Sequence, residues 1–169
     1  MSTRDNEKPG TDSTPCGSHA APAREVEMHT CLDMMQRMYL FQDLTARELQ
    51  KIQKISYVLD CPANRILIKE GATSDLLYMI LDGQVAVYRD QKHLATLSRG
   101  DHFGEMALLN KSPRSATVMS TLDCSLLVIE REKFFDLINN DQTLGMKTLW
   151  AISCQLSVRL EEVLAGSYK

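Results

Sequence analysis

The residues best suited to chemistry lie in one short stretch, residues 100–118, which reads GDHFGEMALLNKSPRSATV. Within it Glu105 follows a glycine, and Arg114 comes nine residues later between a proline and a serine. The planar guanidinium of an arginine can bind a phosphate at two points, and Ser115 adds a hydroxyl beside it. Two interpretations are open from these residues alone. They could form a solvated ion pair on a tight loop, which would contribute little to stability, or two parts of one ligand site.

The segment between the two charges favours a ligand site. Gly104–Leu109 is predicted to form one or two helical turns, and the glycine allows the backbone to approach a neighbour closely. Unpaired N–H groups at the start of a helix favour an anion. A carboxylate would repel a phosphate, but Glu105 can accept a hydrogen bond from a sugar hydroxyl. An anion pocket with one hydroxyl acceptor at its edge describes a site for a ribose phosphate.

Length and charge restrict the class of protein that carries this stretch. A chain of 169 residues is expected to form one domain, and its net charge of −3 argues against a protein that grips nucleic acid. No apolar run approaches membrane-spanning length, and the N-terminus lacks the apolar stretch of a signal peptide. We therefore expect a cytoplasmic protein without a nucleic-acid or membrane partner.

Metal, disulfide and catalytic chemistry have little support in the sequence. His102 stands alone between charged and aromatic neighbours, and His93 lies in a different predicted strand, so no metal site is expected. There is no nucleophile with a nearby base, no catalytic pair of carboxylates and no Walker loop, so no enzyme activity is expected. The cysteines are odd in number and widely scattered, which predicts small buried or half-buried thiols; they are Cys16, Cys31, Cys61, Cys124 and Cys154.

The chain divides into a tail and one domain. Residues 1–24 hold three of the five prolines and almost no large aliphatic side chains, which predicts a disordered tail. Residues 25–169 form the predicted domain, with N-terminal helices over 26–55, β-structure over 56–130 and C-terminal helices over 131–165. A capping box, Thr45 to Glu48, begins the second of the N-terminal helices.

Short strands at nearly regular spacing predict the middle of the domain. Asp82-Gly83 is the strongest turn signal and predicts a two-residue hairpin. Seven or eight strands of this kind indicate a closed or double-layered structure, a barrel or jelly roll, so the fold class is mainly β with flanking helices. The predicted strands are 57–59, 65–69, 76–81, 84–89, 93–97, 116–120 and 125–130.

The last forty residues are predicted to form two helices. The first begins at Arg131 and stops at Asn139-Asn140, and the second runs from Gln142 to Ala165. Apolar residues repeat every three or four positions along the second helix and predict either a face that packs on the β-structure or a dimer seam. They are Met146, Leu149, Ile152, Leu156, Leu160 and Val163.

FGEMALLNKSPRSATV closely resembles the phosphate-binding cassette of the cyclic nucleotide-binding domain family. That family includes the catabolite activator proteins, the regulatory subunits of protein kinase A and nucleotide-gated channels. The resemblance extends to LLYMILDGQVAVYR, to the KEG before it and to the closing helices, from about Leu40 to Ala165. It implies an eight-stranded antiparallel β-roll with N-terminal helices, a short phosphate-binding helix and a long C-terminal lid helix.

The resemblance implies a role for each matching position. Glu105 would take the ribose 2′-hydroxyl, Arg114 would pair with the cyclic phosphate, and Ser115 would supply a hydroxyl to it. Backbone N–H groups of Gly104–Ala107 would complete the anion pocket, and the long helix would cover the base. The expected ligand-binding residues are Phe103, Gly104, Glu105, Met106, Ala107, Arg114, Ser115, Ala116, Arg159 and Val163.

The resemblance further implies a receptor for cAMP, with cGMP as the alternative. Family members that favour cGMP often have threonine after the arginine, whereas Ser115 is similar to the bacterial cAMP activators. No cofactor is expected besides this ligand. Binding would shift Phe134 and Phe135 and let the long helix close, which would signal to an effector protein.

The sequence is compatible with more than one way in which the domain could act on other molecules. Transcription factors of the family continue with a helix-turn-helix, but this chain ends at Lys169 without one, so a lone sensor module is expected. A homodimer through the C-terminal helix is one way in which it could act. The alternative is a protein-interaction or dimerisation module on the same fold that works without a ligand.

Overall fold

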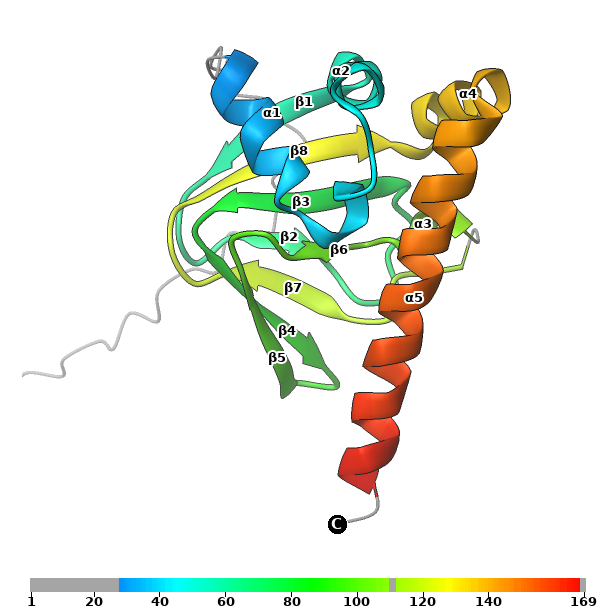
Figure 1. Ribbon diagram of the computed structural model, residues 1–169. Coiled ribbons are helices and arrows are strands. Elements are labelled where there is room, and N and C mark those ends of the chain that lie inside the picture. The colour runs from blue at the N-terminus through cyan, green and yellow to red at the C-terminus, as the bar shows by residue number, and fades with distance from the viewer. Residues whose placement is uncertain (1–27, 110–111, 168–169) are drawn as a thin grey trace, which may run out of the picture.

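The computed structural model of the chain describes residues 28–109 and 112–167, so the predicted tail of residues 1–24 lies outside the described residues. In these ranges eight antiparallel strands lie between helices at both ends (Figure 1), which confirms the predicted fold class. The elements are α1 (Met28–Gln36), η1 (Tyr39–Phe41), α2 (Ala46–Lys54), β1 (Ser56–Cys61), β2 (Ile66–Ile68), β3 (Leu76–Asp82), β4 (Gln84–Arg89), β5 (Lys92–Ser98), β6 (His102–Phe103), α3 (Met106–Leu109), β7 (Thr117–Ser120), β8 (Cys124–Glu130), α4 (Arg131–Asn140) and α5 (Gln142–Ser167).

The strands form two four-stranded sheets, in the orders β1-β8-β3-β6 and β2-β7-β4-β5. Strand β8 shows how the core is divided, because successive side chains of a strand point to opposite faces. Leu126 and Val128 pack with residues of both sheets, whereas Leu127 and Ile129 pack with residues of the helices. The first sheet is therefore buried on both faces, by the second sheet on one side and by the helices on the other.

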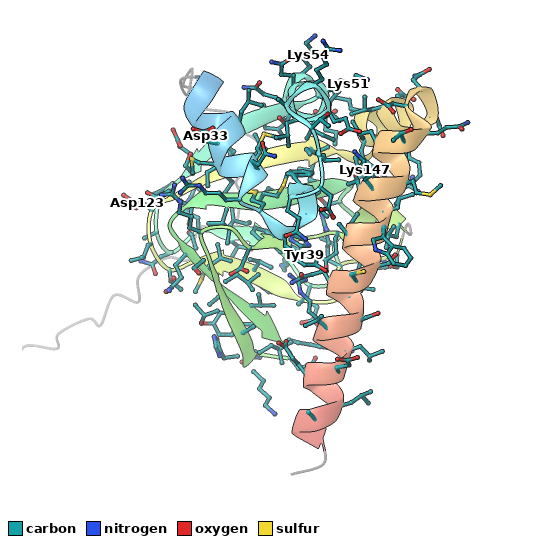
Figure 2. All side chains as sticks on the ribbon, viewed as in Figure 1. Asp33, Tyr39, Lys51, Lys54, Asp123 and Lys147 are labelled. Atoms are coloured by element: carbon teal, nitrogen blue, oxygen red, sulfur yellow. The ribbon has the colours of Figure 1, made fainter. Side chains whose placement is uncertain are left out.

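The second N-terminal helix, α2, begins where a local signal places it. Thr45 accepts a hydrogen bond from the backbone N–H of Glu48 at 3.3 Å, and the Glu48 carboxylate accepts one from the backbone N–H of Thr45 at 2.7 Å. The predicted capping box at the start of α2 is thus confirmed. The same carboxylate pairs with Lys147 of α5 at 3.0 Å, and Lys51 pairs with Asp141 at 2.6 Å, so α2 is tied to the start of α5 (Figure 2).

The hairpin predicted at Asp82-Gly83 is wrong. Strands β3 and β4 belong to different sheets, and only Gly83 of the pair has a positive φ, +94°. A Cβ at Gly83 would collide with the carbonyl oxygen of Asp123, so this glycine allows a close crossing between the sheets. The two-residue hairpin is instead Asp90-Gln91 between β4 and β5, where both residues have positive φ as such a turn requires.

The apolar stripe predicted along the C-terminal helix is only partly correct. Ile152 is fully buried, but Met146 and Leu160 are 73% and 59% exposed. The buried face is rotated towards Leu144, Thr148, Ala151 and Ile152. Thr148 can lie in this face because its hydroxyl donates to the carbonyl of Leu144 at 2.9 Å, which satisfies the buried polar group within the helix.

No helix in residues 28–109 and 112–167 is long and apolar enough to cross a membrane, and no group of three or more His, Cys, Asp or Glu in that part could hold a metal ion. The two-residue strand β6, which pairs with β3, was not predicted, because two residues carry no readable alternation.

Candidate functional site

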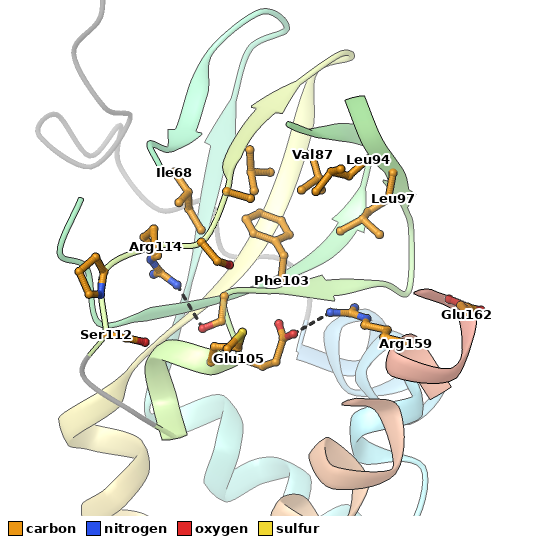
Figure 3. A pocket seen from close by; sticks show the side chains of 17 residues that line it. Ile68, Val87, Leu94, Leu97, Phe103, Glu105, Ser112, Arg114, Arg159 and Glu162 are labelled. Atoms are coloured by element: carbon orange, nitrogen blue, oxygen red, sulfur yellow. Dashed lines mark hydrogen bonds and ion pairs between the residues drawn. The ribbon is translucent and has the colours of Figure 1, made fainter. Parts of the chain in front are cut away.

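A cavity of about 530 Å³ opens between the second sheet, the segments on either side of α3 and the second half of α5 (Figure 3). Eight of the ten predicted ligand-binding residues line it: Phe103, Gly104, Glu105, Met106, Arg114, Ser115, Ala116 and Arg159. The side chains of the other two, Ala107 and Val163, lie outside the described residues. Residues that are far apart in the sequence therefore meet at one cavity.

Arg114 is buried at one end of the cavity, with 7% of its surface exposed. Its Nη2 donates to the carbonyl of Leu76 at 2.6 Å and to the hydroxyl of Ser74 at 3.0 Å, and its Nη1 donates to the carbonyl of Gly104 at 3.2 Å. Its Nε has no hydrogen-bond partner in the described part of the chain. Burial lowers the pKa of this guanidinium, but an arginine remains charged at neutral pH. The site therefore holds a buried positive charge whose Nε–H is not used by the described residues.

The backbone around Arg114 is fixed by the loop that carries the KEG sequence. The N–H of Gly71 donates to the carbonyl of Arg114, and the N–H of Arg114 donates to the carbonyl of Ala72, both at 2.9 Å. Gly71 has a φ of +77°, which favours glycine. The loop and the arginine thus hold each other in place, although they are some forty residues apart in the sequence.

Gly104 brings its backbone against the Arg114 guanidinium. It has a φ of +85°, and a Cβ built on it would lie 2.7 Å from Arg114 Nη1 and 2.8 Å from the carbonyl oxygen of Leu76. Both the conformation and the space therefore require a glycine. The sequence predicted only that the backbone at Gly104 approaches some neighbour closely. The structure constrains this position more strongly, because the neighbouring atom belongs to the guanidinium of Arg114.

Glu105 is also buried, with 6% of its surface exposed, and its ion pair is with Arg159 of α5. Arg159 Nη1 donates to Glu105 Oε1 at 2.7 Å, and Arg159 Nη2 donates to the carbonyl of His102 at 2.9 Å. The solvated pair of Glu105 with Arg114, which was one of the two interpretations, is therefore wrong. Both side chains are buried, and each has other partners.

His102 lies beside this ion pair, and only 2% of its surface is exposed. Burial lowers the pKa of its imidazole, the charge of Glu105 raises it, and the charge of Arg159 lowers it. Its Nε2 has no hydrogen-bond partner among the described residues. Since burial is the largest effect, His102 is expected to be neutral at the site.

Most of the apolar wall of the cavity was not predicted from the sequence, although Phe103 was. Phe103 stacks on Tyr78, with ring centroids 5.0 Å apart, and forms part of this wall. The residues that line the cavity without being among the predicted ligand-binding residues are Ile68, Val87, Leu94, Ala95, Leu97, Ser112, Pro113, Val118 and Glu162, of which Ser112 and Glu162 are polar. Alternation within the strands predicted inward-facing residues, but it could not distinguish a cavity wall from packed core.

Comparisons with known proteins agree with this geometry. Residues 58–141 match the family model described as "Cyclic nucleotide-binding domain". A cGMP-dependent protein kinase of Drosophila melanogaster is 35% identical over 107 residues, 63% of this chain, but the chain spans only 9% of that kinase. A crystal structure of a cyclic nucleotide-binding domain from Methylobacillus flagellatus KT covers 79% of this chain and is itself covered to 78%, with 27% identity and a TM-score of 0.72.

A second solved structure extends the comparison to a regulatory protein. The regulatory domain of Toxoplasma gondii PKA, crystallised with cAMP, shares 28% identity with a TM-score of 0.59; the match covers 64% of this chain and 43% of that one. The matched family and the cavity lined by the cassette residues lead to the same assignment. Residues 58–141 of this chain belong to the cyclic nucleotide-binding domain family.

Proposed function

We propose that this chain is a receptor that binds cAMP in the cavity beside α5 and signals to an effector protein through that helix. The observation that carries the proposal is the cavity itself, which joins the buried Arg114 to the buried Glu105 and continues into an apolar wall. A buried cation with an unused donor suits an anionic phosphate, and a carboxylate suits a sugar hydroxyl. The apolar wall suits a base.

Each part of the ligand would have a complementary part of the site. The cyclic phosphate would lie near Arg114 and Ser115, and the ribose 2′-hydroxyl would donate to Glu105. The base would lie against the apolar side chains of the second sheet, under α5. These roles rest on the resemblance of the cassette, and the arrangement of the cavity supports them.

The proposal is tested by isothermal titration calorimetry of the wild type and of Arg114→Ala with cAMP. Hydrogen bonds to charged groups contribute about 1.5–3 kcal/mol, so the variant should bind at least about tenfold more weakly. Arg47→Ala, an exposed arginine on α2, is the matched control and should bind like the wild type. Absence of wild-type binding at high micromolar nucleotide, or an unaffected Arg114→Ala variant, would contradict the proposal.

The choice of cAMP over cGMP is the finer part of the proposal. Ser115 supports cAMP through its resemblance to the bacterial cAMP activators, while the similar proteins include both a cGMP-dependent kinase and a cAMP-bound regulatory domain. A competition titration of cAMP against cGMP on the wild type measures the preference directly. Tighter binding of cGMP would reverse the assigned preference for cAMP, but it would still support the proposed function as a cyclic nucleotide receptor.

Signalling would follow from a different affinity of the ligand for two positions of α5. A ligand can shift such an equilibrium only by this difference in affinity. Phe134 of α4 is buried in a hydrophobic cluster that also contains residues of α5, and Phe135 packs against the same cluster. Movement of either phenylalanine would therefore change the packing of α5. The effector, and a cytoplasmic location, remain predictions from the sequence.

A second candidate function is supported by the exposed side of α5. Met146, Trp150, Leu160 and Leu164 are between 49% and 73% exposed, which is unusual for large apolar side chains on one helix. This side could bind another protein or a second copy of the chain without any ligand. A thermal-shift titration with nucleotides separates the two functions, because a ligand that binds only the native state must raise the melting temperature.

A further inference from the structure

Two free cysteines lie side by side at one end of the first sheet. Cys61 is the last residue of β1 and Cys124 is the first residue of β8, and the register of these antiparallel strands places them directly opposite each other. We propose that Cys61 and Cys124 form a disulfide site, at which a peroxide joins β1 to β8. The pair shares no residue with the nucleotide cavity, so this inference is independent of the proposed function.

The backbone geometry of the pair suits a disulfide. Residues directly opposite each other in an antiparallel ladder have Cα atoms about 4.5 or 5.5 Å apart, and disulfides need a separation of about 4.4–6.8 Å. Opposed side chains also leave the sheet on the same face. Both thiols are buried in the cluster between the two sheets, where Cys61 is 2% and Cys124 is 4% exposed. A bond between them therefore requires no displacement of the strands.

The hydrogen bonds of the two thiols can be given up without leaving their acceptors unpaired. Cys61 Sγ donates to the carbonyl of Pro62 at 3.5 Å, but that carbonyl also accepts from Ser120 Oγ at 2.7 Å. Cys124 Sγ donates to the carbonyl of Gln84 at 3.3 Å, but that carbonyl also accepts from a backbone N–H at 2.9 Å. A thiol is a weak donor, so these carbonyls keep their stronger partners when the sulfurs join.

A hollow of about 400 Å³ leads to both cysteines. Cys61 and Cys124 line it together with three carboxylates, those of Asp60, Asp82 and Asp123. It lies at the end of the sheets away from α5, where Asp123 is labelled in Figure 2. The carboxylates disfavour an anionic oxidant such as glutathione disulfide. Hydrogen peroxide is small and uncharged, so it suits this hollow.

The reaction with hydrogen peroxide balances without a further reactant. One thiolate attacks a peroxide oxygen, the O–O bond breaks, the sulfur becomes a sulfenic acid and one water leaves. The other thiol then attacks that sulfur, the S–S bond forms, and the sulfenic oxygen leaves as a second water with the remaining proton. The two thiols lose two electrons in total, and one peroxide is reduced to two waters.

Burial affects the rate of the first step. It raises the pKa of the Cys124 thiol, and the charges of Asp123 and Asp82 raise it further, against the opposing effect of a hydrogen bond with the backbone. Because the thiolate is the reactive form, oxidation at neutral pH should be slow and should need an excess of peroxide.

A disulfide here would fasten an edge strand beside the crossing between the sheets. Strand β1 is the outermost strand of its sheet and has β8 as its neighbour. Gly83, where the chain passes from β3 to β4, lies against the same place, since a Cβ built on it would be 2.8 Å from Cys124 Sγ. A bond that closes so long a loop restricts the unfolded chain, so the oxidised protein should melt about 5–10 °C higher than the reduced protein.

Peptide mapping tests the pairing. The folded wild type is treated with hydrogen peroxide, denatured in N-ethylmaleimide and digested with trypsin without a reductant. Cys61 falls in tryptic peptide 55–65 and Cys124 in peptide 115–131, and each peptide holds one cysteine. The two peptides should be linked, lighter than the sum of their masses by two hydrogen atoms, and dithiothreitol should separate them.

Variants and an unfolded control show whether the fold selects this pair. Cys61→Ser should abolish the link, whereas Cys154→Ser, at the half-buried thiol of α5, should leave it unchanged. In urea the link should lose its predominance over links with the other cysteines.

Three results would overturn the proposal. The first is the absence of a link between peptides 55–65 and 115–131 in the folded wild type after exposure to excess peroxide. The second is a predominance of links to Cys16, Cys31 or Cys154. The third is a linked protein that melts no higher than the reduced one, which would show that the bond does not fasten β1. None of these measurements uses a nucleotide, so their failure and the failure of the proposed receptor function are distinguishable.

Discussion

At the scale of single residues, the site depends on how closely the backbone approaches Arg114. The guanidinium is bonded to two backbone carbonyls and one hydroxyl, and Gly104 leaves no room for a side chain beside it. A buried charge held in this way cannot adopt another rotamer without loss of several hydrogen bonds. The glycine and the arginine therefore work as one structural unit.

Gly104→Ala should separate this effect from ordinary backbone strain. An alanine at a positive φ costs about 1–2 kcal/mol wherever it occurs, and Gly100→Ala is the matched control, with a φ of +93° and no atom within 4 Å of the added Cβ. Only Gly104→Ala would also displace Arg114. We expect both variants to lose similar stability from strain in urea titrations, but only Gly104→Ala to lose further stability and most of its cAMP binding. Equal nucleotide affinity in the two variants would contradict this reasoning.

At the scale of elements, α5 is held at its start by α2 and farther along by the roll. Glu48 completes the capping box of α2 and also pairs with Lys147, so one carboxylate orders the start of one helix and the position of another. Its pKa is lowered most by the hydrogen bond from the Thr45 backbone, and further by Lys147, against the opposing effect of burial. The charged form is therefore the one that stabilises this junction.

The lowered pKa of Glu48 predicts a dependence of stability on pH. Because the folded-state pKa lies below the ordinary value of 4.5, the contribution is present above about pH 4.5 and is lost as the pH falls through the folded-state pKa. Glu48→Gln keeps the capping hydrogen bond but not the charge, so at pH 7 it should be less stable by about 1 kcal/mol.

Urea titrations at pH 7 and pH 3.5 check this difference. It should be smaller at pH 3.5 than at pH 7, because the charge of Glu48 contributes fully only above about pH 4.5 and its contribution is lost as the pH falls through the lowered folded-state pKa. Asp141, whose pKa is lowered by Lys51, titrates in the same direction in both proteins and cancels from the comparison. A difference that is the same at both pH values would show that the charge of Glu48 does not contribute.

At the scale of the whole molecule, α5 separates the cavity from a surface that has no partner in the described structure. Arg159 and Glu162 face the cavity, whereas Met146 and Trp150 are more than two-thirds exposed. Met146, Trp150, Leu160 and Leu164 follow alternating steps of four and three residues through Ser153 and Ser157, which is the spacing of a coiled-coil seam. A second copy of the chain that packs on this side would contact α5 directly, so its binding would depend on the position of the helix.

Light scattering tests the homodimer proposed here through this face. We expect the wild type to have twice the 19.1 kDa mass of the chain and Trp150→Glu to have the monomer mass. Leu122→Glu, at an equally apolar position that is 56% exposed in the turn between β7 and β8, should remain dimeric. If the wild type is monomeric both with and without cAMP, the homodimer prediction is wrong. The exposed face of α5 would then be a candidate binding surface for a different protein.

The sequence by itself was sufficient to predict the class of fold and to identify the residues of the cassette. The approximate positions of seven of the eight strands, the capping box of α2 and the start of α5 follow from local rules of propensity and periodicity, and they are found as predicted. The cassette residues are close together in the chain, so their types and spacing already indicate a phosphate and a hydroxyl. Local order of this kind needs no knowledge of distant contacts.

Only the tertiary structure decided what depends on segments that are far apart in the sequence. The sequence could not show that Asp82-Gly83 crosses between sheets, that the buried face of α5 is rotated away from the predicted stripe, or that Glu105 pairs with Arg159 and not with Arg114. In each case the outcome is set by which surfaces pack together. Periodicity shows that a face is apolar, but the partner that covers it, and the charge that meets a buried carboxylate, are fixed only when the chain has folded.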